Sequence, residues 1–372
     1  MIELLHICVP LIWMLIVKQV FKETISWKEG AIQVVVISLI TIGVWNAGKY
    51  GKMADTEIWN GEITSKKRVH DYYETSYEIC TGSGKNQTCT THYEDHYTVK
   101  WYAYTTAGGN ILFDSYDDSW ESTRNNRPNP ARYLSAKVGE PVAIVHSYDN
   151  YIQAVPEAIF NQTVAVEEEF KDLIPNQPIV YDFYRIDRVM PVGVKMPPTD
   201  VKKINYTLNM GLRKLGPKKQ VNINLVIVNT DDPNYRYSLE FAWKSGEKND
   251  ATIIIGSTDY PKIDFVEVMT FGKNKGNELF KEYLSDELFT LEEIDTEKVP
   301  AIILNKISKH FDRINMAEFE EYESAIEPAT WVKWLAWLLS IGLSIGLTYF
   351  FHRHDTFGNE MRGWRHGNFH RY

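Results

Sequence analysis

Two cysteines and two histidines lie close together in the sequence, and these residue types bind zinc. Cys80, Cys89, His92 and His96 follow the spacing Cys-x8-Cys-x2-His-x3-His. Zinc accepts two thiolates and two imidazoles in a tetrahedral site. On a β-strand, however, His92 and His96 point to one face and Cys89 to the other, so a Zn²⁺ site needs a turn between them. We favour the alternative, a Cys80–Cys89 disulfide with both histidines on the surface.

Four aspartates provide the residue types for a second kind of site. Asp231, Asp232, Asp250 and Asp259 flank strand-like runs, where clustered carboxylates would suit a site for a divalent ion such as Ca²⁺ or the active site of a phosphatase. Asp231 and Asp232 also precede a helical stretch, and helix capping, which we favour, explains them without a ligand. The loop from Gly272 to Asn277 opens another helix and is a candidate anion site, although a plain strand-to-helix connection explains it equally well.

The composition and the absence of common motifs limit the functional classes. The sequence contains no Walker loop, dinucleotide fingerprint, Gly-x-Ser-x-Gly elbow or His-Glu-x-x-His motif. Its formal net charge is −9, and residues 49–328 hold 32 basic and 44 acidic residues. Since phosphate binding needs a clustered basic face, general nucleic-acid binding is excluded. A non-enzymatic role is favoured.

The elements that position these residues include a membrane-spanning stretch. Residues 329–351, ATWVKWLAWLLSIGLSIGLTYFF, carry one charge, Lys333, and are long enough to cross a hydrocarbon layer of about 30 Å. Small residues at four-residue spacing predict close packing against another span or, in a homo-oligomer, against a second copy. These residues are Ser340, Gly342, Ser344 and Gly346.

Two further spans are predicted near the N-terminus. Residues 1–17 are apolar but short, and a cleaved signal peptide competes with the retained helix that we favour, because the sequence starts Met-Ile-Glu without a basic residue. Residues 18–30 form a polar loop. Residues 31–48 contain no charge and predict the second span.

Basic residues predict the orientation of the three spans. Cytoplasmic loops are rich in Lys and Arg, so the loop 18–30 and the tail 352–372 are expected in the cytoplasm, with the tail against anionic lipid. The large region between them is then periplasmic, in the inner membrane of a bacterial host. The tail carries Arg353, Arg362, Arg365 and Arg371, whereas a few basic residues beyond the second span oppose this orientation, namely Lys49, Lys52, Lys66, Lys67 and Arg68.

The first extramembrane region, residues 55–165, is predicted to be all-β. Its short runs are rich in Tyr, Val, Ile, Thr and Trp and are separated by turn residues. Five or six such strands predict a small barrel or sandwich. The stretches DTEIWNGEITSKKRVHDYYETSYEIC, HYEDHYTVKWYAYTT and VGEPVAIVHSYDNYIQAVPEAIF resemble a family of membrane proteins of unknown function from tailed bacteriophages.

The second region, residues 201–315, has the pattern of an α/β sandwich with a mixed sheet. It follows a proline-bearing linker, residues 166–200. A helix over Asn205 to Leu215 is expected to end at Gly216-Pro217, and VNINLVIVNT and NDATIIIGS are apolar runs of strand length. The strands INLVIVNT and NDATIIIG and the helix YRYSLEFAWKSG resemble the TPM-domain family, which implies acid-phosphatase activity, divalent-ion binding or maintenance of protein complexes.

These patterns predict a membrane-anchored, multidomain, phage-type protein. Its two extracytoplasmic modules are expected to bind or modulate an envelope or virion protein. One alternative is a divalent-ion-dependent phosphohydrolase of the TPM type, and another is a structural component of the virion. No cofactor is expected, with Zn²⁺ and Ca²⁺ as the alternatives described above.

Overall fold

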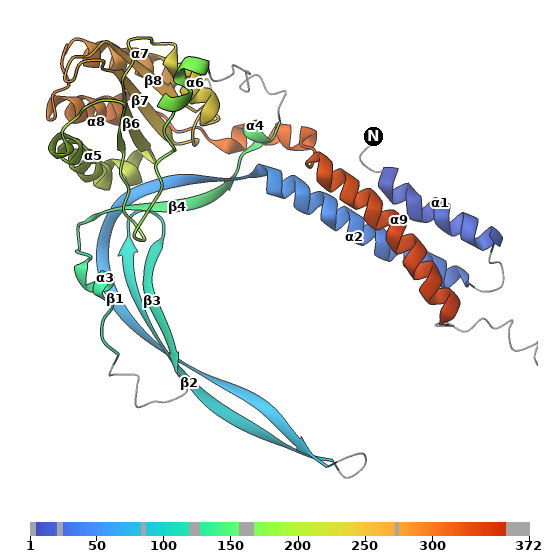
Figure 1. The fold of residues 1–372 in the computed structure, drawn as a ribbon. Coiled ribbons are helices and arrows are strands. Elements are labelled where there is room, and N and C mark those ends of the chain that lie inside the picture. Colours follow the sequence, from blue (N-terminus) through green and yellow to red (C-terminus); the bar gives the residue numbers. More distant parts are fainter. Residues whose placement is uncertain are drawn as a thin grey trace, which may run out of the picture. The chain divides into compact units, whose positions relative to one another are not determined.

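The computed structural model describes residues 5–20, 25–82, 87–118, 127–155, 167–271 and 275–354. The chain divides into two compact units (Figure 1). The first comprises Met1–Asp55, Tyr148–Ala158 and Met316–Tyr372, and the second comprises Thr56–Ser147 and Ile159–Asn315.

The first unit is built on three helices that pack against one another, α1 (Leu5–Val20), α2 (Trp27–Met53) and α9 (Thr330–Arg353). The short elements α4 (Tyr151–Ala154) and η5 (Met316–Ala325) complete it. Among the described residues, two helices, α2 and α9, are long and apolar enough to cross a membrane, and α1 is shorter. α2 is longer than the predicted span because a capping box at Ser26 and Glu29 starts the helix before residue 31.

The second unit begins with a four-stranded sheet in the order β3-β2-β1-β4. Its strands are β1 (Ala54–Thr81), β2 (Thr88–Thr105), β3 (Asn110–Asp118) and β4 (Pro141–Asp149). β2 pairs antiparallel with both β1 and β3. Trp101, Ala103 and Phe113 are buried on one face of this sheet, where the helix α3 (Ala131–Ser135) lies close to β2.

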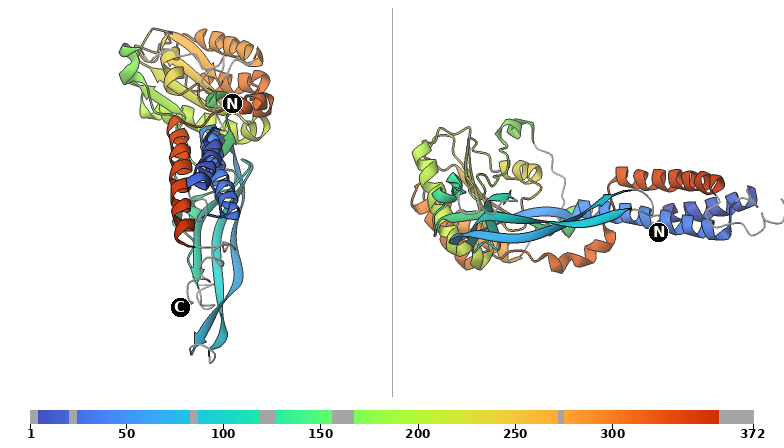
Figure 2. Two further views of the ribbon diagram at one scale, coloured as in Figure 1. Left: turned by 90° about the vertical axis from the view of Figure 1, so that its right-hand side faces the viewer. Right: turned by 90° about the horizontal axis from the view of Figure 1, so that it is seen from below.

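The predicted barrel or sandwich is therefore wrong for the described residues, which form one curved layer. β1 and β2 continue past their neighbours as a two-stranded ribbon (Figure 2). The physical reason is that the many tyrosines of this region are not all core residues. Tyr72, Tyr77 and Tyr93 are among the exposed large side chains, so the ribbon has no apolar face on which a second layer could pack.

The second sheet confirms the mixed α/β expectation. It has the order β5-β6-β7-β8, with β5 (Val189–Val192), β6 (Asn222–Val228) and β7 (Asp250–Gly256) parallel and β8 (Phe265–Thr270) antiparallel to β7. The buried side chains of α5 (Pro198–Lys219), α7 (Lys275–Phe289) and α8 (Lys298–His310) pack on one face. Those of η4 (Glu168–Leu173) and α6 (Tyr235–Ala242) pack on the other.

Two boundaries in this region differ from the sequence-based expectation. The stretch 166–200 is not only a linker, because it contains η4 and the sheet strand β5. Pro191 lies in β5, which is an edge strand, and an edge position tolerates a residue without an N–H. The helix α5 also continues through Gly216-Pro217 and ends at Lys219, with Gln220 in the left-handed conformation (φ 49°).

Candidate functional site

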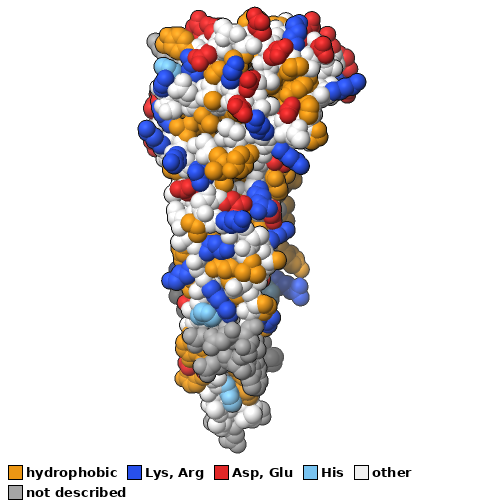
Figure 3. All heavy atoms as spheres, turned by 90° about the vertical axis from the view of Figure 1, so that its left-hand side faces the viewer, with side chains coloured by type: hydrophobic (Ala, Val, Ile, Leu, Met, Phe, Trp, Pro, Cys, Tyr) orange, Lys and Arg blue, Asp and Glu red, His pale blue; other side chains and the backbone are white. Residues whose placement is uncertain are grey.

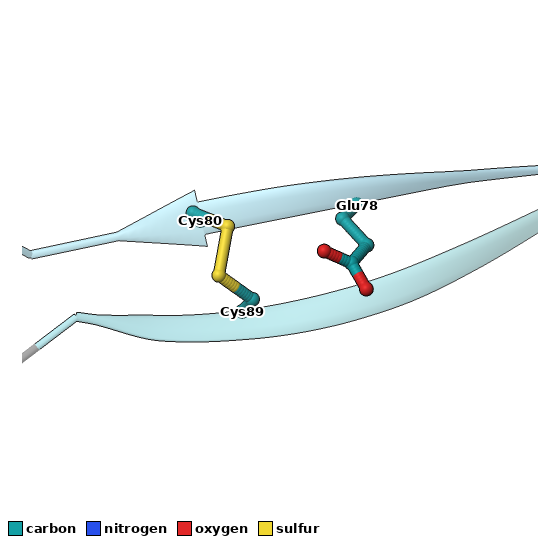
Figure 4. A group of neighbouring side chains, drawn as sticks. All are labelled: Glu78, Cys80 and Cys89. Carbon is teal, nitrogen blue, oxygen red and sulfur yellow. A yellow bond between two sulfur atoms is a disulfide. The ribbon is translucent and has the colours of Figure 1, made fainter. Parts of the chain in front are cut away.

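Cys80 and Cys89 face each other across the β1–β2 pair and form a disulfide, with an S–S distance of 1.98 Å (Figure 4). His92 and His96 do not join them. The ring of His92 stacks on Tyr77, with centroids 5.7 Å apart, and that of His96 stacks on Tyr73, at 4.9 Å.

This arrangement offers zinc no tetrahedral site. In the described part of the chain, one group of three potential ligands has its ligand atoms within 4.8 Å of one another, namely Glu78, Cys80 and Cys89. Both sulfurs of that group are bonded to each other, so neither is a thiolate. A zinc site would require a different arrangement of this hairpin, and we do not propose one.

The hairpin is the most exposed β-structure of the second unit. We define the arm as residues 73–81 of β1 and 88–96 of β2, where the two strands pair with each other but not with β3. Apart from the half-buried His96, every residue of the arm is exposed. Figure 3 shows hydrophobic and histidine side chains on the surface near its lower end, where the arm lies in Figure 1.

Because directly paired residues of an antiparallel ribbon share a face, the register defines the two faces of the arm. The histidine face carries Tyr73, Thr75, Tyr77, Ile79, Thr81, Thr88, Thr90, His92, Glu94 and His96. The carboxylate face carries Glu74, Ser76, Glu78, Cys80, Cys89, Thr91, Tyr93 and Asp95.

Side chains on the histidine face bind one another. Besides the two Tyr–His stacks, Tyr73 Oη donates to Asp117 Oδ2 of β3 at 2.7 Å, and Thr75 Oγ1 lies 3.0 Å from His96 Nε2. The hydrogen bond to Asp117, together with burial and the charge of that carboxylate, raises the pKa of Tyr73. On the carboxylate face, Asp95 Oδ1 accepts from Tyr72 Oη at 2.6 Å. Tyr93 differs from the other tyrosines, because it is 68% exposed and no ring contact or hydrogen bond to its side chain occurs among the described residues.

The four predicted aspartates do not form one site. Asp231 and Asp232 follow β6, and Asp259 follows β7, so all three lie at the carboxyl ends of parallel strands. Asp232 Oδ1 accepts from Asn234 N at 2.9 Å in the turn before α6. The N-cap of α6 is Asn234, without a side-chain capping hydrogen bond, so the capping role favoured above is wrong for this helix. Asp250 starts β7 and so lies at the opposite edge of the sheet, about 20 Å away for a seven-residue strand.

Asp250 belongs instead to a buried polar cluster that sequence reasoning missed. Arg188, 1% exposed, donates from Nε to Asn209 Oδ1 at 2.8 Å and from its two Nη atoms to Asn222 and Asn60. Asn222 Nδ2 in turn donates to Asp250 Oδ1 at 2.8 Å. Burial lowers the pKa of Arg188 to about 9 and raises that of Asp250 to about 6.

The cluster holds the first sheet to the second within this unit. Asn60 lies on β1, and its Nδ2 donates to Val221 O at 2.9 Å, while Asn249 Nδ2 donates to Ile58 O at 2.8 Å. Gly216 of α5 lies so close that a Cβ there would come 2.3 Å from Asn60 O. The one available sequence signal was the presence of Asn222 and Asn224 in an otherwise apolar strand.

A buried carboxylate on β1 forms ion pairs with two cationic side chains. Glu57 of β1 is 2% exposed and accepts from Arg313 Nε at 3.0 Å and from Lys248 Nζ at 3.2 Å. Breaking a buried pair leaves an uncompensated charge, which makes such contacts costly to separate. These contacts hold the two sheets together and offer no open position to a substrate.

The small residues of α9 lie on two faces of the helix, and the serine pair packs against another helix as predicted. Ser340 and Ser344 are buried, and Gln33 Nε2 of α2 donates to Ser344 O at 2.8 Å. At Gly342 and Gly346, an added Cβ would have no atom within 4 Å. The reason is geometric, since a helix turns about 100° per residue and positions two apart lie on nearly opposite sides.

Two sequence-based candidates lie outside the described residues. These are most of the anion loop from Gly272 to Asn277 and the basic tail 352–372 beyond His354. Asn277 itself is described, and its side chain exchanges two hydrogen bonds with the backbone of Asp312, at 2.8 and 3.0 Å. That contact gives Asn277 a role in holding the start of α7.

Comparison with known protein families, characterised proteins and solved structures found no match.

Proposed function

We propose that this chain is a phage-type integral membrane protein that displays its arm and its α/β domain outside the cytoplasm and binds an envelope or virion protein. The observation that carries the proposal is the arm itself. Exposed tyrosines and other aromatic residues are enriched at protein–protein interfaces. The arm presents Tyr73, Tyr77 and Tyr93 with exposed fractions of 41%, 51% and 68%.

Membrane anchoring rests on the helices of the first unit. α2 and α9 have the length and composition of spans, and the shorter α1 packs against both, which supports a bundle of three crossings. A disulfide persists in oxidising compartments such as the periplasm, so the Cys80–Cys89 bond supports an extracytoplasmic arm. The positive-inside distribution of the tail and of the loop 18–30 supports the same orientation.

The test is a chain without the arm. Residues 74–95 are replaced by Asn-Gly, which joins the paired residues Tyr73 and His96 through a two-residue hairpin turn. Purified from infected cells after cross-linking, the native chain is expected to carry a reproducible partner that the shortened chain lacks. A partner retained by the shortened chain would contradict the proposal. Detection of the chain in purified particles would favour the virion-component alternative.

A divalent-ion-dependent phosphohydrolase is the second candidate. The observation that favours it concerns Lys262, at the carboxyl edge of the sheet. The hydrogen bond from Lys262 to Asp264 is the largest cause that raises the pKa of Lys262, and the charges of Asp259 and Asp231 raise it further. Asp231 and Asp259 therefore both lie close to this lysine. This function predicts phosphatase turnover that Asp231→Asn abolishes. Asp250→Asn, at the other edge, should leave that turnover unchanged.

A further inference from the structure

The carboxylate face of the arm has side chains without a cationic partner. Glu74 and Asp95 are directly opposite each other in the register, and like charges so placed destabilise a strand pair. Glu78 lies further toward the tip on the same face. None of the ion pairs in the described part of the chain involves these three carboxylates.

Tyr93 lies between these carboxylates. It pairs with Ser76, a small residue, and is 68% exposed. Glu78 and the Glu74–Asp95 pair are each two residues along the ribbon from this position, which corresponds to about 7 Å. A cation held over the ring within about 6 Å is attracted by its π-face and would have a carboxylate on each side.

The chemistry of this face selects its occupant. A divalent metal is unsupported, because no third ligand atom joins Glu74 and Asp95 within 4.8 Å among the described residues. Nucleic acid and anionic lipid would be repelled by this face, because all of its charged side chains are carboxylates. A protein segment that carries Arg or Lys complements both the charges and the exposed ring.

We propose that the carboxylate face of the arm binds a basic segment of a partner protein, with an Arg or Lys side chain on Tyr93 between Glu78 and the Glu74–Asp95 pair. This inference rests on the proposed function and adds the chemistry of the partner. The histidine face is not the docking surface, because its rings and hydroxyls already bind one another.

The test compares two variants with equal changes in charge. Glu74→Gln with Glu78→Gln removes two of the three charges of the carboxylate face and leaves Asp95, and Asp71→Asn with Glu94→Gln removes the same charge from the histidine side of the ribbon. All four side chains are exposed, so both variants are expected to fold. Binding of a fluorescent nona-arginine peptide to the full chain in detergent is measured at physiological salt.

The first variant is expected to bind the peptide about fivefold more weakly than the native chain, since it loses two exposed charge pairs with the peptide. Tyr93→Ala should weaken binding to a similar extent, and the Asp71–Glu94 variant should change it by less than about twofold. Equal losses in the two charge variants would overturn the inference, and so would unchanged binding in the first. If the first variant keeps the cellular partner that the arm-shortened chain loses, the inference fails while the proposed function stands.

Discussion

At the scale of single residues, the buried Arg188–Asp250 cluster predicts how the stability of the folded chain depends on pH. Burial raises the pKa of Asp250 to about 6, whereas the pKa of an aspartate in an unfolded chain is about 4. Between these values the folded chain holds a proton that the unfolded chain has lost, so this group's contribution to stability falls as the pH rises through that window.

Asp250→Asn removes this contribution. On going from pH 7.5 to 5.5, the native chain should gain about 1 kcal/mol of stability that the variant lacks. Thermal unfolding of the full chain in detergent at both pH values measures the difference. Asp259→Asn, an exposed aspartate at the other end of β7, is the control and should behave as the native chain does. An identical pH dependence in the native chain and Asp250→Asn would contradict this account.

The same residues show where sequence reasoning stops. The pattern placed Asp250 beside a strand correctly, and it offered Asp231, Asp232 and Asp259 as companions because all four flank strands. Strand direction decides which ends meet, and that direction depends on pairing across the sheet. Arg188 gave no signal at all, since its partners Asn60, Asn209 and Asn222 come from three distant parts of the chain.

At the scale of elements, patterns made of adjacent residues predicted well. The apolar runs within residues 221–230 and 249–257 became β6 and β7, and the charge-free stretch 31–48 lies inside α2. Long-range packing accounts for the failures. The four-residue strand β5 contains a proline, and it becomes a strand because β6 pairs with it. At Gly216 of α5, the backbone of Asn60 lies too close for a Cβ, so this glycine serves a packing contact and does not end the helix.

Substitutions in α9 test how the three helices of the first unit pack. Ser344→Leu places a large side chain where Gln33 and Thr348 already occupy the bundle core, so it should destabilise helix packing by about 1–3 kcal/mol. Gly342→Leu enters open space and should not. The unfolding temperature of the full chain in detergent distinguishes the two. A smaller particle for Gly342→Leu in size-exclusion chromatography with light scattering would instead show that the glycine face joins two copies.

At the scale of the whole molecule, β1 connects three parts of the chain. α2 ends at Met53 and β1 begins at Ala54, without an intervening linker. Further along, Glu57 and Asn60 bind the α/β sheet, and residues 73–81 form half of the arm. Because this one strand joins the apolar helix α2 to both the second sheet and the arm, the proposed crossing of α2 would place the second sheet and the arm on the side where β1 begins.

The orientation has a direct test through the thiols. In a Cys8→Ser background, expressed in bacteria with an outer membrane, an impermeant maleimide should label Cys80 and Cys89 only after the outer membrane is opened and the disulfide is reduced. A cysteine introduced in the tail, Asn359→Cys with Cys80→Ser and Cys89→Ser, should react only once the inner membrane is opened. The basic residues Lys49 and Lys52 oppose this orientation. If the arm thiols react without reductant, and only in lysed cells, these two lysines determine the orientation and the basic tail does not. The arm would then face the cytoplasm, and its partner would be sought there.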